Sequence, residues 1–227
     1  MNMSMPSDAL SDYLKRLLGL HFPDGRSVDF SPSDFSLALE RCEYSFSRIR
    51  KKYYQDDGGG VVFDHLNADH MAVFLYFLGN SIWKSGGETD LPVKLSYLNK
   101  ILHGLDLFYS VGMPDVFLLV HPLGSVIGNA QYSDYLVVYQ NCTVGAVDSD
   151  YPVFGEGVVL YSRSSVVGKC RVGDDVVFAA NSAVVNTDVP SRTVVLGTYP
   201  NCRFKENSIP VRARCFDPSF ENQGVVL

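Results

Sequence analysis

His121 and Asp106 have side chains and a spacing that could support acid–base chemistry. His121 opens the segment HPLGSVIG at residues 121–128, and Asp106 lies fifteen residues before it. An imidazole suits general-base work because its pKa lies near neutrality, and a positioned base contributes roughly 10²–10⁴-fold to a rate. The residues alone leave a second interpretation open, in which His121 is a corner residue held by a backbone carbonyl and Asp106 caps a turn.

A second pair of histidines, His65 and His70, lies beside Asp64 and Asp69 and raises the question of a metal. Their spacing of five places them on different faces of a helix, and no further ligands are evident, so no metal site is predicted. We expect residues 63–70 to cap a helix and to pack at a domain or subunit contact.

Composition excludes several classes of function. The chain has 227 residues and a formal net charge of -6, and its densest basic run is confined to residues 48–52, which argues against nucleic-acid binding. No stretch is long and apolar enough for a membrane span. The five cysteines are scattered without a CxxC pair, so we expect reduced thiols and a cytoplasmic protein.

The first 104 residues favour helices. Apolar residues at helical spacing predict four of them. They run from a Ser7-Asp8 cap, from Ser33 to about Tyr54, from about Ala68 to Lys84 before Gly86-Gly87, and from about Pro92 to His103. The run DDGGG at residues 56–60 breaks the chain after the second helix.

From about Leu105 the composition changes to residues that seldom sustain a helix, and apolar residues recur at every sixth position. They stand at Phe154, Leu160, Val166, Val172, Phe178, Val184, Pro190 and Leu196, and upstream at Val126, Tyr132, Val138 and Val144. This period suits a β-solenoid whose triangular coil has about eighteen residues. The repeat is interrupted around residues 147–151. A β-sandwich of short strands is the alternative, but it leaves the repeat to chance.

Repeats of this kind resemble those of the left-handed β-helix acyltransferases, and the helices in front narrow the resemblance to the serine acetyltransferase-like branch. It covers about residues 60–205. The resemblance implies an α+β fold with a helical N-terminal domain at 1–104 and a left-handed parallel β-helix of hexapeptide repeats at 105–205. A C-terminal tail at 206–227 follows, without a readable role.

The segment at residues 121–128 is similar to the pattern around the catalytic histidine of that family, which has an aspartate at the position of Asp106. The resemblance implies that Asp106 stacks nearly one coil from His121 on the same edge and orients its imidazole. His121 would then take the proton from an acceptor hydroxyl as it attacks the thioester of acetyl-CoA.

Two positions depart from the serine enzymes of this family, which carry an arginine and a histidine where this chain has Asp150 and Tyr151. Asp150 would repel a carboxylate, which favours a neutral sugar or glycan precursor over serine as the acceptor. Tyr151 either donates a hydrogen bond to the acceptor or is a surface residue. Glu156 matches a family position near the acceptor, with an exposed corner glutamate as the alternative.

The resemblance also implies that acetyl-CoA lies between neighbouring solenoids of a homotrimer, where small side chains let it approach the backbone. Ser162 and Ala180, one coil apart, match small positions along the groove between the solenoids, and Ala179 and Ser182 are their neighbours. The candidates for the nucleotide phosphates are Arg192, Arg203 and Lys205. Tight corners of a solenoid also require small residues, so the small residues do not decide between the two explanations.

Three functions are compatible with these observations. The first is an acetyl-CoA-dependent O-acetyltransferase acting on a sugar or glycan precursor, and the second acetylates serine or a related small metabolite. The third is a non-enzymatic β-helix protein for assembly or binding, motivated by the missing second histidine. The N-terminal helices either join two trimers or cap the open end of the solenoid.

Overall fold

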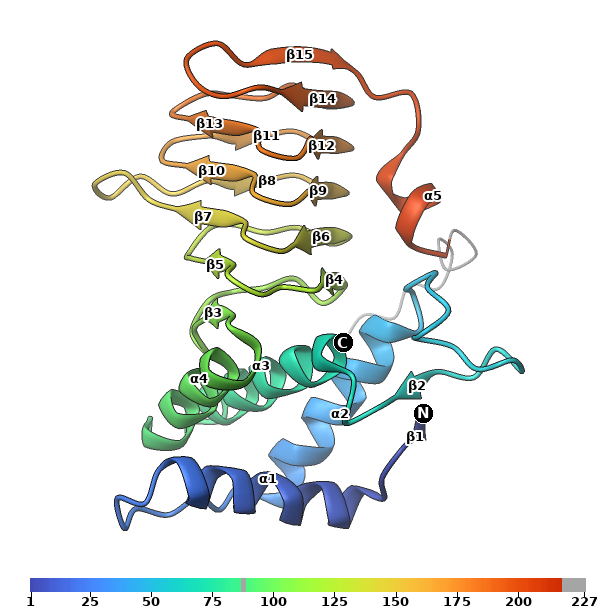
Figure 1. Ribbon diagram of the computed structural model, residues 1–227, viewed down its shortest axis with the longest axis vertical. Helices are drawn as coiled ribbons and strands as arrows, with labels where there is room; N and C mark the ends of the chain where they lie inside the picture. The colour runs from blue at the N-terminus through green and yellow to red at the C-terminus, as the bar shows by residue number, and fades with distance from the viewer. Residues whose placement is uncertain (87–88, 218–227) are drawn as a thin grey trace.

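A base of helices carries a column of short strands in the computed structural model, which describes residues 1–86 and 89–217 (Figure 1). The helices are α1 (Ser7–His21), α2 (Pro32–Phe46), α3 (Ala68–Lys84), α4 (Asp90–His103) and α5 (Val211–Cys215). Two short strands beside the base, β1 (Asn2–Met3) and β2 (Val62–Phe63), pair in parallel. Gly87 and residues 218–227, for which a helix end and the last part of the tail were predicted, lie outside the described residues.

Helix α3 is the centre of the base. Its side chains are buried without interruption from His70 to Ile82, because α2 and α4 pack against it. Arg41 of α2 fixes one contact by donating hydrogen bonds of 3.0 Å to Asn80 Oδ1 and to Ser81 Oγ. Asn67 caps the start of α3, since its Oδ1 accepts from the backbone N–H groups of Asp69 and His70.

Two predicted helix ends were wrong. Helix α1 begins at Ser7 after Pro6 and has no side-chain cap, so Ser7-Asp8 is not the capping pair. Helix α2 ends at Phe46 rather than near Tyr54, because the following residues pair with the tail. Ile49 forms an antiparallel bridge with Phe216, and the N–H of Arg50 donates to the Cys215 carbonyl over 2.9 Å.

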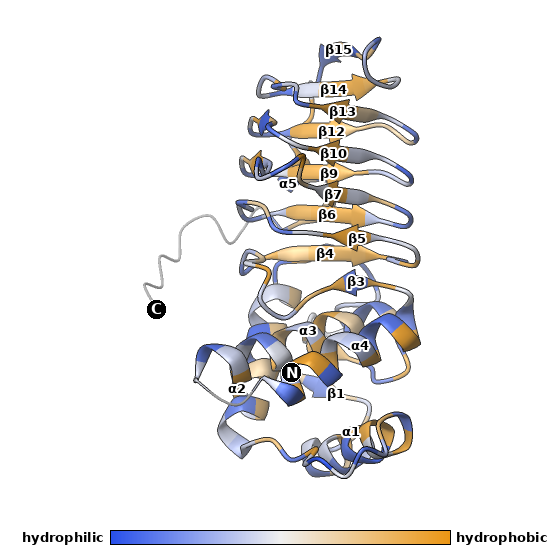
Figure 2. Cartoon of the chain, turned by 90° about the vertical axis from the view of Figure 1, so that its left-hand side faces the viewer, coloured by the Kyte–Doolittle hydropathy of each residue, from blue (hydrophilic) through white to orange (hydrophobic). Residues whose placement is uncertain are grey.

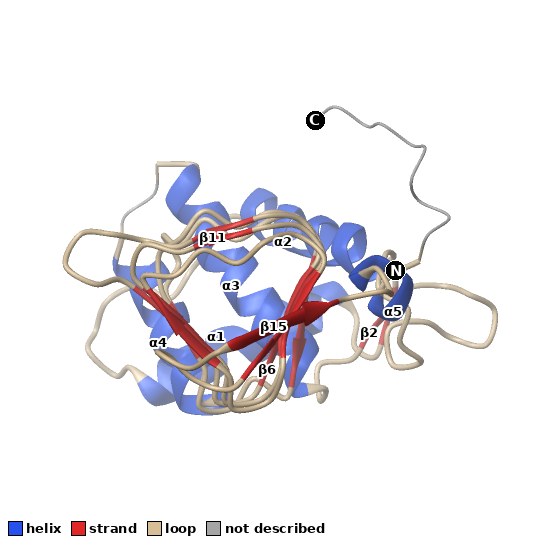
Figure 3. Cartoon of the chain, turned by 90° about the horizontal axis from the view of Figure 1, so that it is seen from above, coloured by secondary structure: helices blue, strands red, loops and turns tan. Residues whose placement is uncertain are grey.

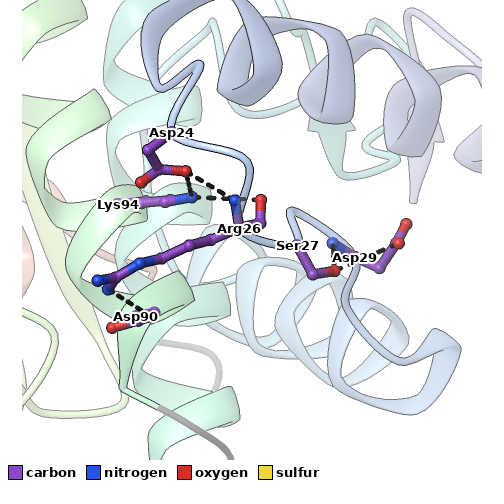
Figure 4. A network of polar contacts seen from close by, with 6 residues as sticks. All are labelled: Asp24, Arg26, Ser27, Asp29, Asp90 and Lys94. Atoms are coloured by element: carbon purple, nitrogen blue, oxygen red, sulfur yellow. Dashed lines mark hydrogen bonds and ion pairs between the residues drawn. The ribbon is translucent and has the colours of Figure 1, made fainter.

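Loop 22–31 is fastened to α4 by a polar network (Figure 4). The buried Lys94 donates a 2.8 Å hydrogen bond to Asp24 Oδ1, and this contact lowers the pKa of the Asp24 carboxyl. Arg26 Nη1 lies 2.7 Å from Oδ2 of Asp90, the first residue of α4. The ammonium of Lys94 is tolerated in the interior because it is paired.

Above the base the chain winds as a parallel β-helix whose three sheets form a triangle when seen along the column (Figure 3). One sheet has six strands: β4 (Phe117–Val120), β6 (Leu136–Tyr139), β9 (Val158–Leu160), β12 (Val176–Phe178), β14 (Thr193–Leu196) and β15 (Arg203–Glu206). The second has five: β3 (Asp106–Leu107), β5 (Val126–Ile127), β7 (Thr143–Gly145), β10 (Ser165–Val167) and β13 (Ala183–Val185). The third has two: β8 (Val153–Phe154) and β11 (Arg171–Val172). Helices followed by a parallel β-solenoid are the predicted α+β architecture.

The register explains the period of six. Ser165 lies beside Ala183 and Val158 beside Val176, eighteen residues apart in both cases. Val137 lies beside Val159, a longer step, because loop 146–152 protrudes between β7 and β8 where the interruption was predicted (Figure 1). Strands β4, β6, β9 and β12 are mostly apolar, whereas β15 is hydrophilic (Figure 2).

The predicted inward positions are confirmed in the middle of the solenoid and wrong at its ends. The buried residues of the repeat are Val138, Val144, Phe154, Leu160, Val166, Val172, Phe178 and Val184. Near the base Ile127 points inward while Val126 is 44% exposed. In the last coil Val189 and Val195 are buried in place of Pro190 and Leu196. Val194 pairs with Val177 only seventeen residues away, so this coil is one residue short.

The tail returns from the last coil to the base. Residues 207–217, including α5, run beside the six-stranded sheet, and Phe216 is fully buried. The Phe216 ring packs edge-on against Tyr135, while the guanidinium of Arg212 lies 4.1 Å from the centre of the same Tyr135 ring. This segment, which had no readable role in the sequence, therefore joins the solenoid to the helices.

Candidate active site

Three edges run along the solenoid where its sheets meet. The His121 edge, between the six-stranded and five-stranded sheets, begins at the turn after β4. The Tyr151 edge, between the five-stranded and two-stranded sheets, carries loop 146–152. The Glu156 edge, between the two-stranded and six-stranded sheets, follows β8. The predicted site residues are distributed over all three.

His121 lies at the junction of the base and the solenoid. Its backbone has a φ of 48°, in the left-handed region, and its N–H donates a 3.0 Å hydrogen bond to Asp69 Oδ1. Its side chain is 81% exposed, and Nδ1 lies 4.0 Å from Asp69 Oδ2. The ring is therefore open to a ligand while its backbone is tethered to α3.

Asp69 was not recognised in the sequence as a partner of His121. It lies in the first turn of α3, and its side chain is 16% exposed. Burial raises the pKa of the Asp69 carboxyl, an effect that the His121 N–H and the His121 charge oppose. Because 52 residues separate the two, no local pattern reveals the contact.

Asp106 does not stack beneath His121 as predicted. The register of β3 places Asp106 beside Val126, five residues past His121, because the turn at 121–125 intervenes. Asp106 Oδ2 instead lies 2.6 Å from Lys100 Nζ. Within the described chain neither a hydrogen bond nor an ion pair joins Asp106 to His121. Asp106 borders a shallow hollow of about 200 Å³ that is also lined by Asn129.

The predicted small residues lie on the His121 edge. Pairing of the six-stranded sheet, continued one or two residues past its strands, sets His121, Gln140, Ser162 and Ala180 in one column. Ala180 is exposed and Ser162 partly so. Ser182 is the exception, because it is fully buried and its hydroxyl donates to the Ala179 carbonyl over 2.7 Å. Its side chain therefore cannot reach a ligand in the groove.

Tyr151 and Asp150 lie at the exposed Tyr151 edge. A hollow of about 470 Å³ is bordered by Tyr151 and by Asn129, Ala130 and Gln131 of the coil below. The backbones of Asp150 and Val147 pair across the loop. No cation of the described residues lies within ion-pair distance of the Asp150 carboxylate, so its charge is uncompensated in a single chain.

Glu156 lies apart from Tyr151, at the other end of β8. It borders a cavity of about 620 Å³ between the solenoid and α5, together with Asp174, Asp175 and Arg212. Within one chain the predicted acceptor-binding residues therefore do not surround His121.

The predicted phosphate-binding cations lie in the last coils but on different edges. Arg192 is on the Glu156 edge, and its Nη2 lies 4.0 Å from Glu206 Oε1. Arg203 and Lys205 are exposed on β15, where they pair with Leu196 and Val194 of β14. Because β15 runs antiparallel to β14, Arg203 is the one at the His121 edge.

Both histidines of residues 63–70 contact other residues of the helical base. His65 Nδ1 lies 2.8 Å from Ser4 Oγ. His70 is buried between Phe46, Tyr54 and Phe63, and burial lowers its pKa to about 4. Neither histidine reaches the His121 edge. In the part of the chain that the structure describes, no helix is long and apolar enough to cross a membrane.

Sequence comparison finds curated relatives that are named as serine acetyltransferases. No protein-family model matches the chain. A putative serine acetyltransferase of Schizosaccharomyces pombe is 30% identical over 132 residues, covering 56% of this chain and 48% of the relative. The serine acetyltransferase of Synechococcus elongatus is 30% identical over 112 residues, covering 47% and 46%. The chain thus spans about half the length of the curated relatives it matches.

Solved structures share the fold. The serine acetyltransferase of Neisseria gonorrhoeae has a TM-score of 0.65 at 17% identity, covering 97% of this chain and 84% of that chain. The enzyme of Brucella abortus gives 0.65 at 20% identity, covering 85% and 82%. A serine acetyltransferase in complex with CoA gives 0.64 at 16% identity, covering 88% and 84%. These likenesses support the predicted left-handed β-helix.

Proposed function

We propose that this chain, a member of the serine acetyltransferase-like branch of the hexapeptide-repeat acyltransferase superfamily, transfers an acetyl group from acetyl-CoA to a hydroxyl. The observation that carries the proposal is the composition of the His121 edge. An exposed imidazole lies at its lower end, small side chains stand above it, and a guanidinium lies at its upper end.

The His121 edge fits an extended donor with phosphates at one end. Four strand steps separate His121 from Gly197 at the top of the column, or roughly 19 Å at the usual spacing of neighbouring strands. Ser162, Ala179 and Ala180 add little bulk, so an extended ligand could approach the backbone. Arg203 would bind the phosphates and Lys205 would add positive charge, whereas Arg192 faces another edge.

The chemistry required of His121 is a single proton relay. Acetyl-CoA supplies the activated thioester when bound. His121 removes the proton of the acceptor hydroxyl while the oxygen attacks the thioester carbon. As the carbon–oxygen bond forms and the carbon–sulfur bond breaks, the imidazolium returns the proton to the leaving sulfur.

A homotrimer would unite the edges that one chain keeps apart. In a closed ring each chain presents one edge to a different edge of its neighbour. The Tyr151 edge of one chain could thus face the His121 edge of the next, with the pantetheine arm between them. Sedimentation of the full chain should give the mass of three copies, or of six if the helical bases pair.

Serine is the acceptor favoured by the relatives. The Schizosaccharomyces pombe and Synechococcus elongatus proteins are both named for it, and a soybean serine acetyltransferase of the same fold has been solved complexed with serine. On this proposal Tyr151 of a neighbouring chain contacts the amino acid, whereas Glu156 lies on another edge.

A neutral sugar or glycan precursor is the acceptor favoured by Asp150. Its carboxylate is uncompensated in one chain and lies next to Tyr151, so a second carboxylate there would be repelled. A polyhydroxyl acceptor would instead give Asp150 and Tyr151 hydrogen-bond partners.

The test is thiol release from acetyl-CoA by the full chain across serine, other amino acids, free sugars and nucleotide sugars. Turnover with one class identifies the acceptor. Serine alone would rule out the glycan acceptor, and sugars alone would rule out serine. If no acceptor raised thiol release above background and the chain did not bind a CoA resin, the non-enzymatic alternative would replace the proposal.

A further inference from the structure

We infer that Asp69 of α3, rather than Asp106, orients the imidazole of His121 and is its positioning residue. The inference rests on the proposed function, because it assigns a role to the neighbour of the proposed base. It concerns a contact between the helical base and the first coil, which gives the base a part in the active site.

Both carboxylate oxygens of Asp69 lie close to His121. Oδ1 accepts the 3.0 Å hydrogen bond from the His121 N–H, and Oδ2 lies 4.0 Å from Nδ1. The second distance is too long for a hydrogen bond in this conformation, but it is within the range at which a carboxylate attracts an imidazolium. Rotation of the exposed ring can shorten it.

Asp69 is held rigidly. Its own N–H donates a 3.0 Å hydrogen bond to the capping Asn67, and the helix is buried from the next residue onward. The start of a helix also favours a negative charge. Tyr54 also interacts electrostatically with Asp69. Its phenol is neutral, because burial raises its pKa. His121 is therefore the group that Asp69 can stabilise when the imidazole takes up a proton.

Asp106 is engaged elsewhere. Its carboxylate lies 2.6 Å from the Lys100 ammonium, and its strand position is beside Val126. Among the described residues Asp106 makes no hydrogen bond or ion pair with His121, whereas Asp69 accepts a hydrogen bond from the His121 backbone.

Two consequences for the base follow from this arrangement. A carboxylate near Nδ1 favours the tautomer with hydrogen on Nδ1, which leaves the Nε2 lone pair free to accept the proton of the hydroxyl. The tether also supplies an acceptor for the His121 N–H, whose left-handed backbone conformation, with a φ of 48°, recurs in the later turns at Asn141, Arg163 and Asn181.

The test compares Asp69→Asn with Asp106→Asn in the full chain, with His121→Ala as the reference. Asn keeps an oxygen that can accept from the His121 N–H, so Asp69→Asn removes the charge and spares the tether. We expect it to lower kcat about 10- to 100-fold with little change in the KM for acetyl-CoA. Asp69→Glu, which restores the charge, should recover part of the loss.

A second readout does not depend on activity. Long-range ¹⁵N NMR of labelled histidines, with the His121 signals assigned by their absence in His121→Ala, reports the tautomer directly. Asp69→Asn should shift His121 towards the Nε2–H form, and Asp106→Asn should not. An unchanged tautomer in folded Asp69→Asn, or a shift in Asp106→Asn instead, would overturn the inference. Full activity of His121→Ala would instead refute the proposed base, whatever the tautomer shows.

Discussion

The ring centres of Tyr139, the last residue of β6, and Tyr161, the residue after β9, lie 4.9 Å apart. Each immediately precedes a residue of the His121 column, Gln140 and Ser162 respectively. Burial raises the pKa of Tyr139, so this phenol is neutral near neutral pH. The two residues therefore lie in the chain immediately before the column of the His121 edge that carries the small residues proposed to admit acetyl-CoA.

Filling that edge should obstruct the donor. Ala180→Phe places a large ring in the proposed path of the pantetheine arm, and we expect the KM for acetyl-CoA to rise about tenfold or more. The fold should persist because Ala180 is exposed. Steady-state kinetics measure the effect, and Ala9→Phe on the exposed side of α1 is the matched control. Equal KM values in the two variants would place the donor elsewhere.

The charge of Asp150 should govern the choice of acceptor. Replacing it by Arg removes the repulsion that a carboxylate would meet, so kcat/KM for serine should rise relative to that for a neutral sugar, by about tenfold. Competition between the two acceptors measures the ratio. Asp148→Arg in the same loop controls for a change in net charge. If both variants shift the ratio equally, Asp150 has no specific role.

His70 should make the stability depend on pH. Its pKa is about 4 in the folded chain because burial disfavours its charged form, against about 6.5 when unfolded. The unfolded chain then binds more protons between those values, so stability is full above about pH 6.5 and falls as the pH drops towards 4, by up to about 1.4 kcal/mol per pH unit. The partly buried His103, whose pKa burial also lowers to about 4, acts in the same direction. Burial raises the pKa values of Asp69 and Asp134, which act against it.

Urea unfolding between pH 7 and pH 4.5 isolates the His70 contribution. His70→Gln keeps an oxygen that can accept from the Asp64 N–H but cannot titrate, so its stability should decline less steeply than that of the natural chain. Tyr54→Phe alters a ring that packs against His70 but removes no group that titrates in this range. Its unfolding free energy should therefore decline as steeply as that of the natural chain. Parallel declines in all three would exclude His70 as the source.

The tail should contribute to the stability of the whole chain. Phe216 is fully buried between the base and the solenoid, so Phe216→Ala should cost about 3–5 kcal/mol of unfolding free energy. Ile209→Ala, at a half-exposed position of the same segment, should cost much less. Denaturant unfolding compares them, and equal losses would mean that the Phe216 contact is not what fastens the tail.

The architecture could be predicted because the repeat is a local signal. An apolar residue at every sixth position identifies the buried side of each strand, as Phe154, Leu160 and Val166 show. The pattern fails where a coil changes length. The short last coil moves the inward position from Pro190 to Val189. The coil from Ile127 to Val144 is also one residue short, which moves the inward position from Val126 to Ile127.

The site was less predictable because it depends on contacts between distant segments. The His121 column could be anticipated in part, since Ser162 and Ala180 are separated by one coil of eighteen residues. The contact between Asp69 and His121 joins a helix to a turn across 52 residues of sequence, so no periodic pattern predicts it. The family resemblance implied that Asp106 would orient His121, but in this chain Lys100 of helix α4 binds that carboxylate.

The central claim is that His121 is the base of an acetyl transfer. The most direct measurement is thiol release from acetyl-CoA by His121→Ala, with the acceptor that the natural chain uses and with the oligomeric mass verified. We predict a loss of roughly 10²–10⁴-fold in kcat, while His21→Ala in α1 retains activity. Turnover by His121→Ala within about twofold of the natural chain would contradict the assignment of His121 as the base.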